Sequence, residues 1–217
     1  MCTTNLCSFV FLEKIIKKRE VILMSRIIGC ESLYIAEITK DDATGSTWKA
    51  PVPIPALIAI DIQDQKDNVT FYSDDTIEQV IPTFAGKEVS VELGYLSNTL
   101  EAMITGNEFA DGAYTQIKEA QAKEFALMFK APKSKGGYSY ICLYKGVLSR
   151  EEANFKTKED SIESNSVTLS GIFMPLQSNG KTFIKADSDE QTPSALIGTW
   201  FTAVPFKAPS SGQKEKK

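Results

Sequence analysis

Hydrophobic and polar residues alternate with a period of two along most of the chain from Cys30 onward. Successive side chains of a strand point to opposite faces, so this period predicts β-strands. The clearest case is 88–93, where Val89, Val91 and Leu93 face a core and the intervening residues face water. Further strands are predicted at residues 33–38, 56–62, 69–72, 123–130, 137–148 and 167–174. The chain is therefore expected to be mainly β, folded as a β-sandwich or barrel.

Three of these strands, 123–130, 137–148 and 167–174, are apolar on both faces. A strand of this kind should be covered on both faces. One cover is the core of the domain, and the other is either a helix or a neighbouring subunit.

One face of 137–148 presents a row of tyrosines. Tyrosine is enriched in protein interfaces, which makes these residues candidates for a subunit interface. Cross-strand aromatic packing and a stacking platform for sugars or bases are the alternatives. The residues of this row are Tyr138, Tyr140 and Tyr144.

Between the strands, residues 63–68 are polar and are expected to form a turn. Asp41–Pro55 is expected to be a long loop that is too polar for a core. Its prolines cannot lie in a central strand because they have no backbone N–H to donate. These are Pro51, Pro53 and Pro55.

Two helices are predicted. Asn98 is expected to cap the first, with Glu101 three residues later as in a capping box, and Gly106 to end it. Its apolar stripe is Leu100, Met103 and Ile104. A second helix is expected at Thr192–Ala203, with Pro193 in its first turn. Trp200 and Phe201 would dock that helix on the body.

The chain is divided into an N-terminal extension (1–24), one domain (25–206) and a flexible polar tail (207–217). The extension has no basic residue before its apolar stretch, unlike a signal peptide, and that stretch is too short to span a bilayer. Residues 19–22 can be encoded by a purine-rich ribosome-binding sequence. We therefore expect translation to begin at Met24; the alternative is a short amphipathic arm.

The chain contains no histidine, which excludes Ser-His and Cys-His nucleophiles, His-ligated zinc and imidazole acid–base catalysis. The adjacent carboxylates Asp74 and Asp75 would point to opposite faces of an extended chain. Residues 187–190 begin like a calcium loop but lack its later glycine and glutamate. Gly136 and Gly137 lack the strand-then-helix context of a phosphate loop. We predict no catalytic residue, no cofactor and no metal site.

The formal net charge of −4 disfavours sequence-independent binding to nucleic acid or to anionic membranes. The four cysteines show no close pairing pattern, so free thiols in a reducing compartment are expected. They are Cys2, Cys7, Cys30 and Cys142.

Seven segments follow one another in a recognisable order between about residues 29 and 190. They are 33–41, 71–75, 89–93, 104–106, 137–146, 156–160 and 168–173. In this order they resemble the major tail protein, or tail-tube protein, of long-tailed phages and prophages of Gram-positive bacteria. Residues 1–24 have no counterpart in the family pattern.

The resemblance implies a β-sandwich or barrel with a flanking helix, the tail-tube fold. Copies form hexameric rings, and the rings stack around a channel through which DNA passes without specific binding. The implied partners are further copies of the chain, a tape-measure protein and tail terminator or baseplate proteins, with no membrane. The implied location is the virion tail, after assembly in the host cytoplasm.

Within this family the loop Asp41–Pro55 is our candidate for the contact between stacked rings. The contact residues are Thr44, Gly45, Ser46, Thr47, Trp48 and Lys49. Their deletion is expected to leave the subunit folded and to abolish tubes. The alternatives are the tube of a bacteriocin or secretion device, a carbohydrate-binding β-sandwich, and a carboxylate-based hydrolase.

Overall fold

The computed structural model describes residues 25–73, 76–153, 166–190 and 192–206. Its main element is a nine-stranded antiparallel sheet with the order β2-β1-β8-β9-β10-β5-β4; β3 also pairs with β1, and β11 with β9. A separate hairpin is formed by β6 and β7. The prediction of a mainly β chain is confirmed.

The strand bounds are β1 Glu31–Asp42, β2 Gly45–Trp48, β3 Val52–Ile54, β4 Leu57–Ser73, β5 Thr76–Leu93, β6 Glu108–Ala110, β7 Ala113–Thr115, β8 Glu124–Pro132, β9 Tyr138–Ala153, β10 Val167–Phe173 and β11 Phe183–Asp187.

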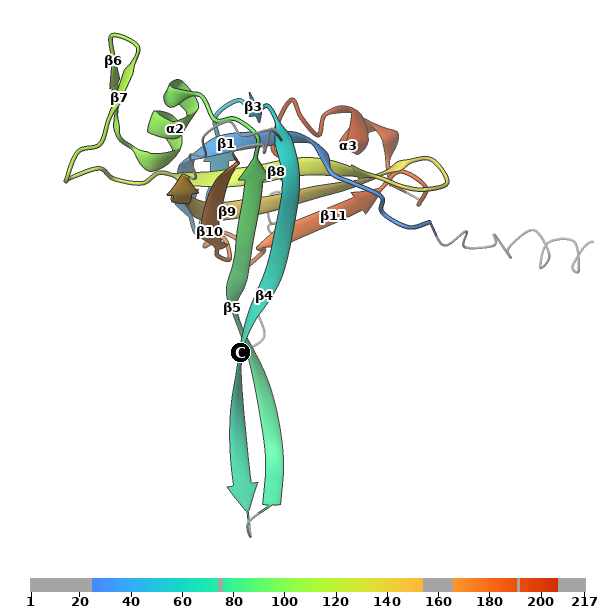
Figure 1. Ribbon diagram of the computed structural model, residues 1–217. Coiled ribbons are helices and arrows are strands. Elements are labelled where there is room, and N and C mark those ends of the chain that lie inside the picture. The colour runs from blue at the N-terminus through green and yellow to red at the C-terminus, as the bar shows by residue number, and fades with distance from the viewer. Residues whose placement is uncertain (1–24, 74–75, 154–165, 191, 207–217) are drawn as a thin grey trace, which may run out of the picture.

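The sheet curves strongly around one hydrophobic core (Figure 1). Ile35 of β1 and Val91 of β5 lie far apart in the strand order, yet both are fully buried in the same cluster. The thiol of Cys30 donates to the backbone oxygen of Ile58 at 3.7 Å, which links the two ends of the sheet. The curvature of a single sheet is closer to a barrel than to two stacked layers.

Helix α2 (Asn98–Thr105) packs against this core. Its N-cap is Ser97, one residue earlier than expected, and Gly106 ends it in the left-handed conformation with φ of 73°. Glu101 does not form a capping box, because its carboxylate pairs with Arg150 at 2.6 Å. The apolar stripe is as predicted: Ile104 is buried in the core, and Leu100 and Met103 pack against it.

The outer face of β1, β8 and β9 carries a second hydrophobic cluster, which the C-terminal segment covers. This segment contains α3 (Ser194–Gly198) and continues through turns to Phe206. Trp200 is fully buried in the cluster, as the docking prediction required. The second helix therefore exists but is shorter than predicted. The second cover of β8 and β9 comes from the same chain, without a neighbouring subunit.

Two predictions about the strands and the loop between them are wrong. The strands expected at 56–62 and 69–72 form one continuous strand, β4, which pairs along its length with an equally long β5. The loop expected at Asp41–Pro55 contains two short strands, β2 and β3, both paired with β1. Pro53 is accommodated in β3 because that strand lies at the edge of the sheet.

Candidate assembly surfaces

The hairpin of β4 and β5 extends far beyond the rest of the sheet (Figure 1). The last residue of β10 pairs with Lys87, so residues 66–73 and 76–85 pair only with each other. We call these residues the arm. A two-stranded hairpin is marginally stable in water when it is isolated. The arm is therefore a part of the fold that a partner would stabilise.

Three large apolar side chains of the arm remain exposed in the single chain. Ile77, Val80 and Phe84 are between 43% and 61% accessible. Val80 and Phe84 lie four residues apart on a regular stretch of β5, so they point to the same face. Pro82 lies between them and has no backbone N–H, which discourages the addition of another strand along this edge. The arm is thus suited to contacts through its faces.

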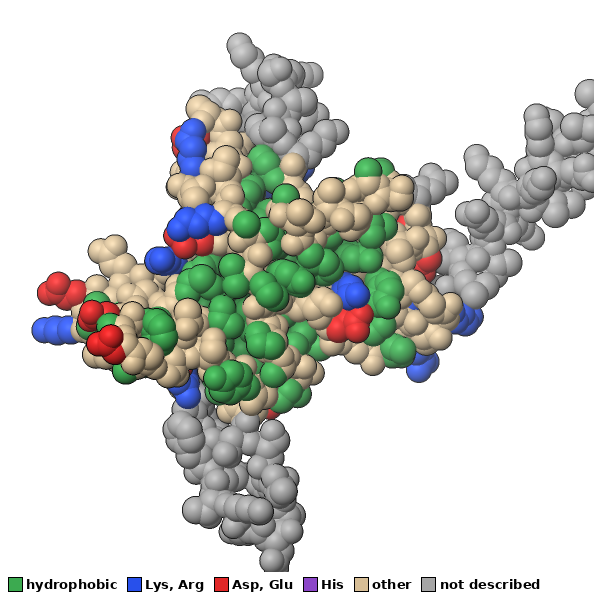
Figure 2. All heavy atoms as spheres, turned by 90° about the horizontal axis from the view of Figure 1, so that it is seen from above, with side chains coloured by type: hydrophobic (Ala, Val, Ile, Leu, Met, Phe, Trp, Pro, Cys, Tyr) green, Lys and Arg blue, Asp and Glu red, His purple; other side chains and the backbone are tan. Residues whose placement is uncertain are grey.

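A second apolar surface lies at the opposite end of the same two strands. β4 begins at Leu57 and β5 ends at Leu93, and exposed apolar residues flank both positions. We call this surface the proline patch; it consists of Pro51, Val52, Pro53, Pro55, Ile58 and Tyr95. Its large members Val52, Ile58 and Tyr95 are between 36% and 63% accessible. Figure 2 shows hydrophobic side chains gathered across the middle of the face opposite the arm.

The proline patch is held in place by backbone contacts. The N–H of Gly94 donates to the carbonyl oxygen of Ala56 at 2.8 Å, which joins the start of β4 to the end of β5. Ala56 has a φ of 61°, a conformation that residues other than glycine rarely adopt. This turn directs the chain from β3 into β4.

Two lysines share the carboxylate of Glu37, and one of them precedes the proline patch in the chain. Lys49, two residues before Pro51, donates to the Glu37 carboxylate at 2.8 Å, and Lys123 lies 3.5 Å from the same carboxylate. The hydrogen bond from Lys49 is the main reason that the pKa of Glu37 is lowered, against the opposing effect of burial. Two ammonium groups around one carboxylate leave a local excess of positive charge.

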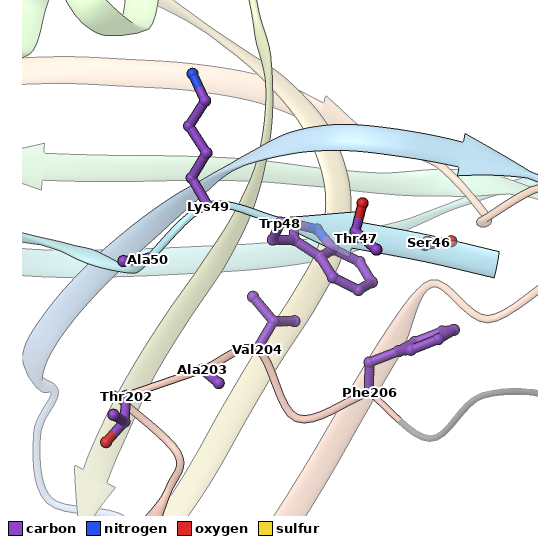
Figure 3. A pocket seen from close by; sticks show the side chains of 9 residues that line it. All are labelled: Ser46, Thr47, Trp48, Lys49, Ala50, Thr202, Ala203, Val204 and Phe206. Atoms are coloured by element: carbon purple, nitrogen blue, oxygen red, sulfur yellow. The ribbon is translucent and has the colours of Figure 1, made fainter.

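A groove of about 420 Å³ separates β2 from the C-terminal segment (Figure 3). Trp48 forms one wall; its indole N–H donates to the Tyr144 carbonyl oxygen at 3.1 Å, and its ring lies 5.1 Å from that of Phe206. The remaining lining residues are Ser46, Thr47, Lys49, Ala50, Thr202, Ala203 and Val204. Lys49 points away from the apolar walls. The lining has no carboxylate and no thiol, so it holds no acid–base pair.

The predicted contact residues Thr44–Lys49 are mostly strand β2. Ser46 is buried, and its hydroxyl hydrogen-bonds to Asp41 and to the Ser178 hydroxyl, both at 2.7 Å. Removing this segment would delete an edge strand together with Trp48. The expectation that the deletion leaves the fold unchanged therefore does not fit the structure.

The carboxylate of Asp41 connects the β1–β2 hairpin to neighbouring parts of the fold. Burial tends to raise the pKa of Asp41, but hydrogen bonds from Ser46, Lys145 and the backbone N–H of Gln177 outweigh it, so the pKa falls below its ordinary 3.8. The Lys145 ammonium lies 3.0 Å from the carboxylate, and both side chains are largely buried. Burial opposes protonation of Lys145, yet its bonds to Asp41 and Glu124 raise its pKa overall.

We expect Asp41→Asn to destabilise the fold by about 2–3 kcal/mol at neutral pH, because it leaves the Lys145 charge under-compensated. The folded-state pKa of Asp41 is depressed. Its contribution is therefore present above the unfolded value, near pH 4, and is lost as pH falls through the folded value. Denaturant unfolding of the wild type and of Asp41→Asn between about pH 7 and pH 2 measures the difference in stability as a function of pH. A difference in stability that stayed constant down to the lowest pH would contradict the role of Asp41.

The tyrosine row is largely taken up inside the chain. Tyr144 is 2% accessible, its hydroxyl donates to the Pro205 carbonyl oxygen at 3.0 Å, and burial raises its pKa. The Tyr140 ring lies 5.6 Å from that of Trp200. Tyr138 remains accessible. As candidate interface residues, Tyr140 and Tyr144 are thus occupied by their own C-terminal segment, and the row forms no open stacking platform.

The acidic turn after β11 forms internal contacts, and the described cysteines remain free thiols. Asp187 ends β11 and pairs with Lys133 at 3.1 Å, and Lys133 also pairs with Asp189. Cys30 and Cys142 are free thiols, and burial raises the pKa of Cys142. Residues 1–24, with Cys2 and Cys7, the pair Asp74–Asp75, segment 156–160 and the tail 207–217 lie outside the described residues.

Within the described ranges, no three residues of the metal-ligating types come together as a cation site. Of the helices described, none has the length and apolar character needed to cross a membrane.

The chain matches no protein-family model and no curated protein. Its function is therefore argued from the surfaces described above.

Proposed function

We propose that this protein is a structural subunit of a phage tail tube, without catalytic activity, whose rings stack around a channel for DNA. The observation that carries this proposal is the arm, which presents Ile77, Val80 and Phe84 to solvent in the single chain. Burying a side chain of this size contributes about 1.5–3 kcal/mol. A second copy of the chain supplies the missing cover. The assignment to a tail comes from the order of segments along the sequence.

The sheet supports the formation of rings. In the described part of the chain, β4 ends the strand order on one side and β2 ends it on the other. Unpaired edges are templates for contact with another chain. Two different edges meet head to tail, and a head-to-tail contact that closes on itself gives a ring.

One face of the sheet suits the wall of a channel. Glu88, Ser90 and Glu92 lie on the face of β5 opposite the core, with Asp61 and Ser170 paired on either side of Ser90. This face carries carboxylates and hydroxyl groups. Like charge repels the phosphates of DNA, so a passing duplex is not retained. We assign this acidic face to the channel.

Making the acidic face basic is expected to cause DNA retention. Tubes of the triple variant Asp61→Lys/Glu88→Lys/Glu92→Lys should co-sediment with duplex DNA, with binding that weakens steeply between about 50 and 200 mM salt. The neutral control, Asp61→Asn/Glu88→Gln/Glu92→Gln, should retain little DNA. Equal retention by both sets of tubes would exclude this face from the channel.

Negative-stain electron microscopy of the purified full chain tests the proposal. At high protein concentration we expect rings or hollow tubes with a visible lumen. A solution that contains only monomers at every concentration, by sedimentation velocity as well as by microscopy, would refute the proposed function.

A further inference from the structure

We infer that the arm of one copy docks on the proline patch of a second copy. This inference rests on the proposed function and specifies the contact between stacked rings. The residues involved are Ile77, Val80 and Phe84 on the arm, and Val52, Ile58 and Tyr95 on the patch.

The geometry favours a stacking contact. The arm and the proline patch lie at opposite ends of β4, whose 17 residues span roughly 55 Å at about 3.3 Å per residue. A copy displaced along this direction brings its arm to the patch of the next copy. The two surfaces differ, so the contact is heterologous and repeats without closing. Repetition along one direction is what a stack of rings requires.

The two surfaces also match chemically. Each exposes large apolar side chains beside a proline that discourages the addition of a further strand: Pro82 in β5 and Pro53 in β3. Both surfaces are therefore unsuited to adding a strand and suited to packing apolar side chains face to face. Tyr95, the most exposed of the patch residues, provides a large amphipathic ring of the kind enriched in interfaces.

The charges around these surfaces are opposite in sign. The sequence of the arm contains two carboxylates, Asp67 and Glu78, and one lysine. Lys49, which precedes the proline patch in the chain, shares the carboxylate of Glu37 with Lys123. An acidic arm and a locally basic patch attract each other and oppose the pairing of two arms. This complementarity favours a second copy of the chain over a nucleic acid as the occupant of the patch.

Photo-crosslinking identifies the receiving surface directly. Phe84 is replaced with p-benzoyl-phenylalanine, and tubes are assembled from an equal mixture of unlabelled and ¹⁵N-labelled chains before irradiation. We expect mass spectrometry to find mixed-isotope crosslinks from residue 84 to residues 50–58 or 95. Crosslinks from intact tubes to another surface, such as the groove beside Trp48, would overturn the docking site and leave the proposed function standing. A failure of the unmodified protein to assemble would refute the proposed function itself.

A paired substitution tests the same contact without a crosslinker. Tyr95→Glu places a carboxylate on the patch at an exposed position, so the subunit should fold normally and stacked tubes should be lost, with rings remaining. The matched control is Ile28→Glu, an equally exposed apolar residue that is hydrogen-bonded through its backbone to Pro132, outside the arm and the patch. The control should still form tubes. Normal tubes from Tyr95→Glu, with melting temperatures equal to wild type, would overturn the inference.

Discussion

Tubes are expected to disappear when Ile77 and Val80 of the arm are both replaced with lysine, while the subunit remains folded. Both side chains are exposed in the single chain, so the double change should alter the free energy of unfolding by no more than about 1 kcal/mol. In the tube that we propose, each position is buried against another copy. Each lysine there loses about 1.5–3 kcal/mol of apolar burial and adds a charge that must be desolvated. Negative-stain microscopy of the sample shows whether tubes form, and a thermal melt of the same sample shows whether the subunit is folded.

The control for this experiment changes the charge of the arm without touching its apolar residues. Gln79→Lys/Thr83→Lys adds the same two positive charges to exposed polar positions of the same strand. We expect these arms still to support tubes. Loss of tubes in the control as well would assign the effect to charge alone, and normal tubes from the Ile77/Val80 variant would contradict the role of the arm.

The largest expected effect on stability is at Trp200. The side chain is fully buried where the C-terminal segment covers the outer face of β8 and β9. Trp200→Ala removes this packing and leaves a cavity, at a cost of about 3–5 kcal/mol, or about 6–20 °C in melting temperature for a chain of this size. The exposed outer face should also promote non-specific aggregation. Denaturant unfolding measures the loss in the free energy of unfolding, and differential scanning calorimetry measures the drop in melting temperature.

Two further variants locate the source of this effect. The indole N–H of Trp200 has no hydrogen-bond partner among the described residues. Trp200→Phe loses no hydrogen bond and keeps most of the ring, so it should cost clearly less than Trp200→Ala. Thr202→Ala, at an exposed neighbour, should change stability by less than about 0.5 kcal/mol. If Trp200→Ala were as mild as Thr202→Ala, the C-terminal segment would not be an integral cover of the sheet.

The period-two pattern predicted the body of the sheet because its strands border a core. Ile35, Val91 and Leu127 are apolar where they face the inner cluster, and this alternation is visible in the sequence. The first helix was predictable for the same reason, since its stripe packs against that core. What the pattern left open was the second cover of β8 and β9. An apolar outer face looks the same in the sequence whether its cover is another subunit or, as here, the chain's own residues 194–206.

The arm was missed because neither of its faces borders the core. Residues 63–68 are polar and resemble a turn, although they continue β4 into the arm. The available signal was the apolar residues Ile77, Val80 and Phe84, which occur without the alternation of a half-buried strand. The proline patch was missed as a surface because its prolines indicate a loop. Short edge strands such as β2 and β11 bury too few residues to show a period.

The surfaces that we propose for self-assembly consequently lie mostly in a different part of the molecule from the doubly apolar strands that the sequence indicated. The doubly apolar strands β8 and β9 are covered within the chain, whereas Ile172 and Met174 at the end of β10 stay exposed. The arm and the proline patch add further exposed apolar side chains. These two surfaces lie at opposite ends of one hairpin, so a single protein carries both halves of a repeating contact.

Cryo-electron microscopy of assemblies of the purified protein is the decisive test of stacking through the hairpin. We expect a hollow tube of stacked rings, in which each β4–β5 hairpin crosses from its own ring to the next and the acidic face of β5 lines the lumen. A reconstruction in which the hairpins lie free in solvent, or in which rings contact one another without them, would contradict it.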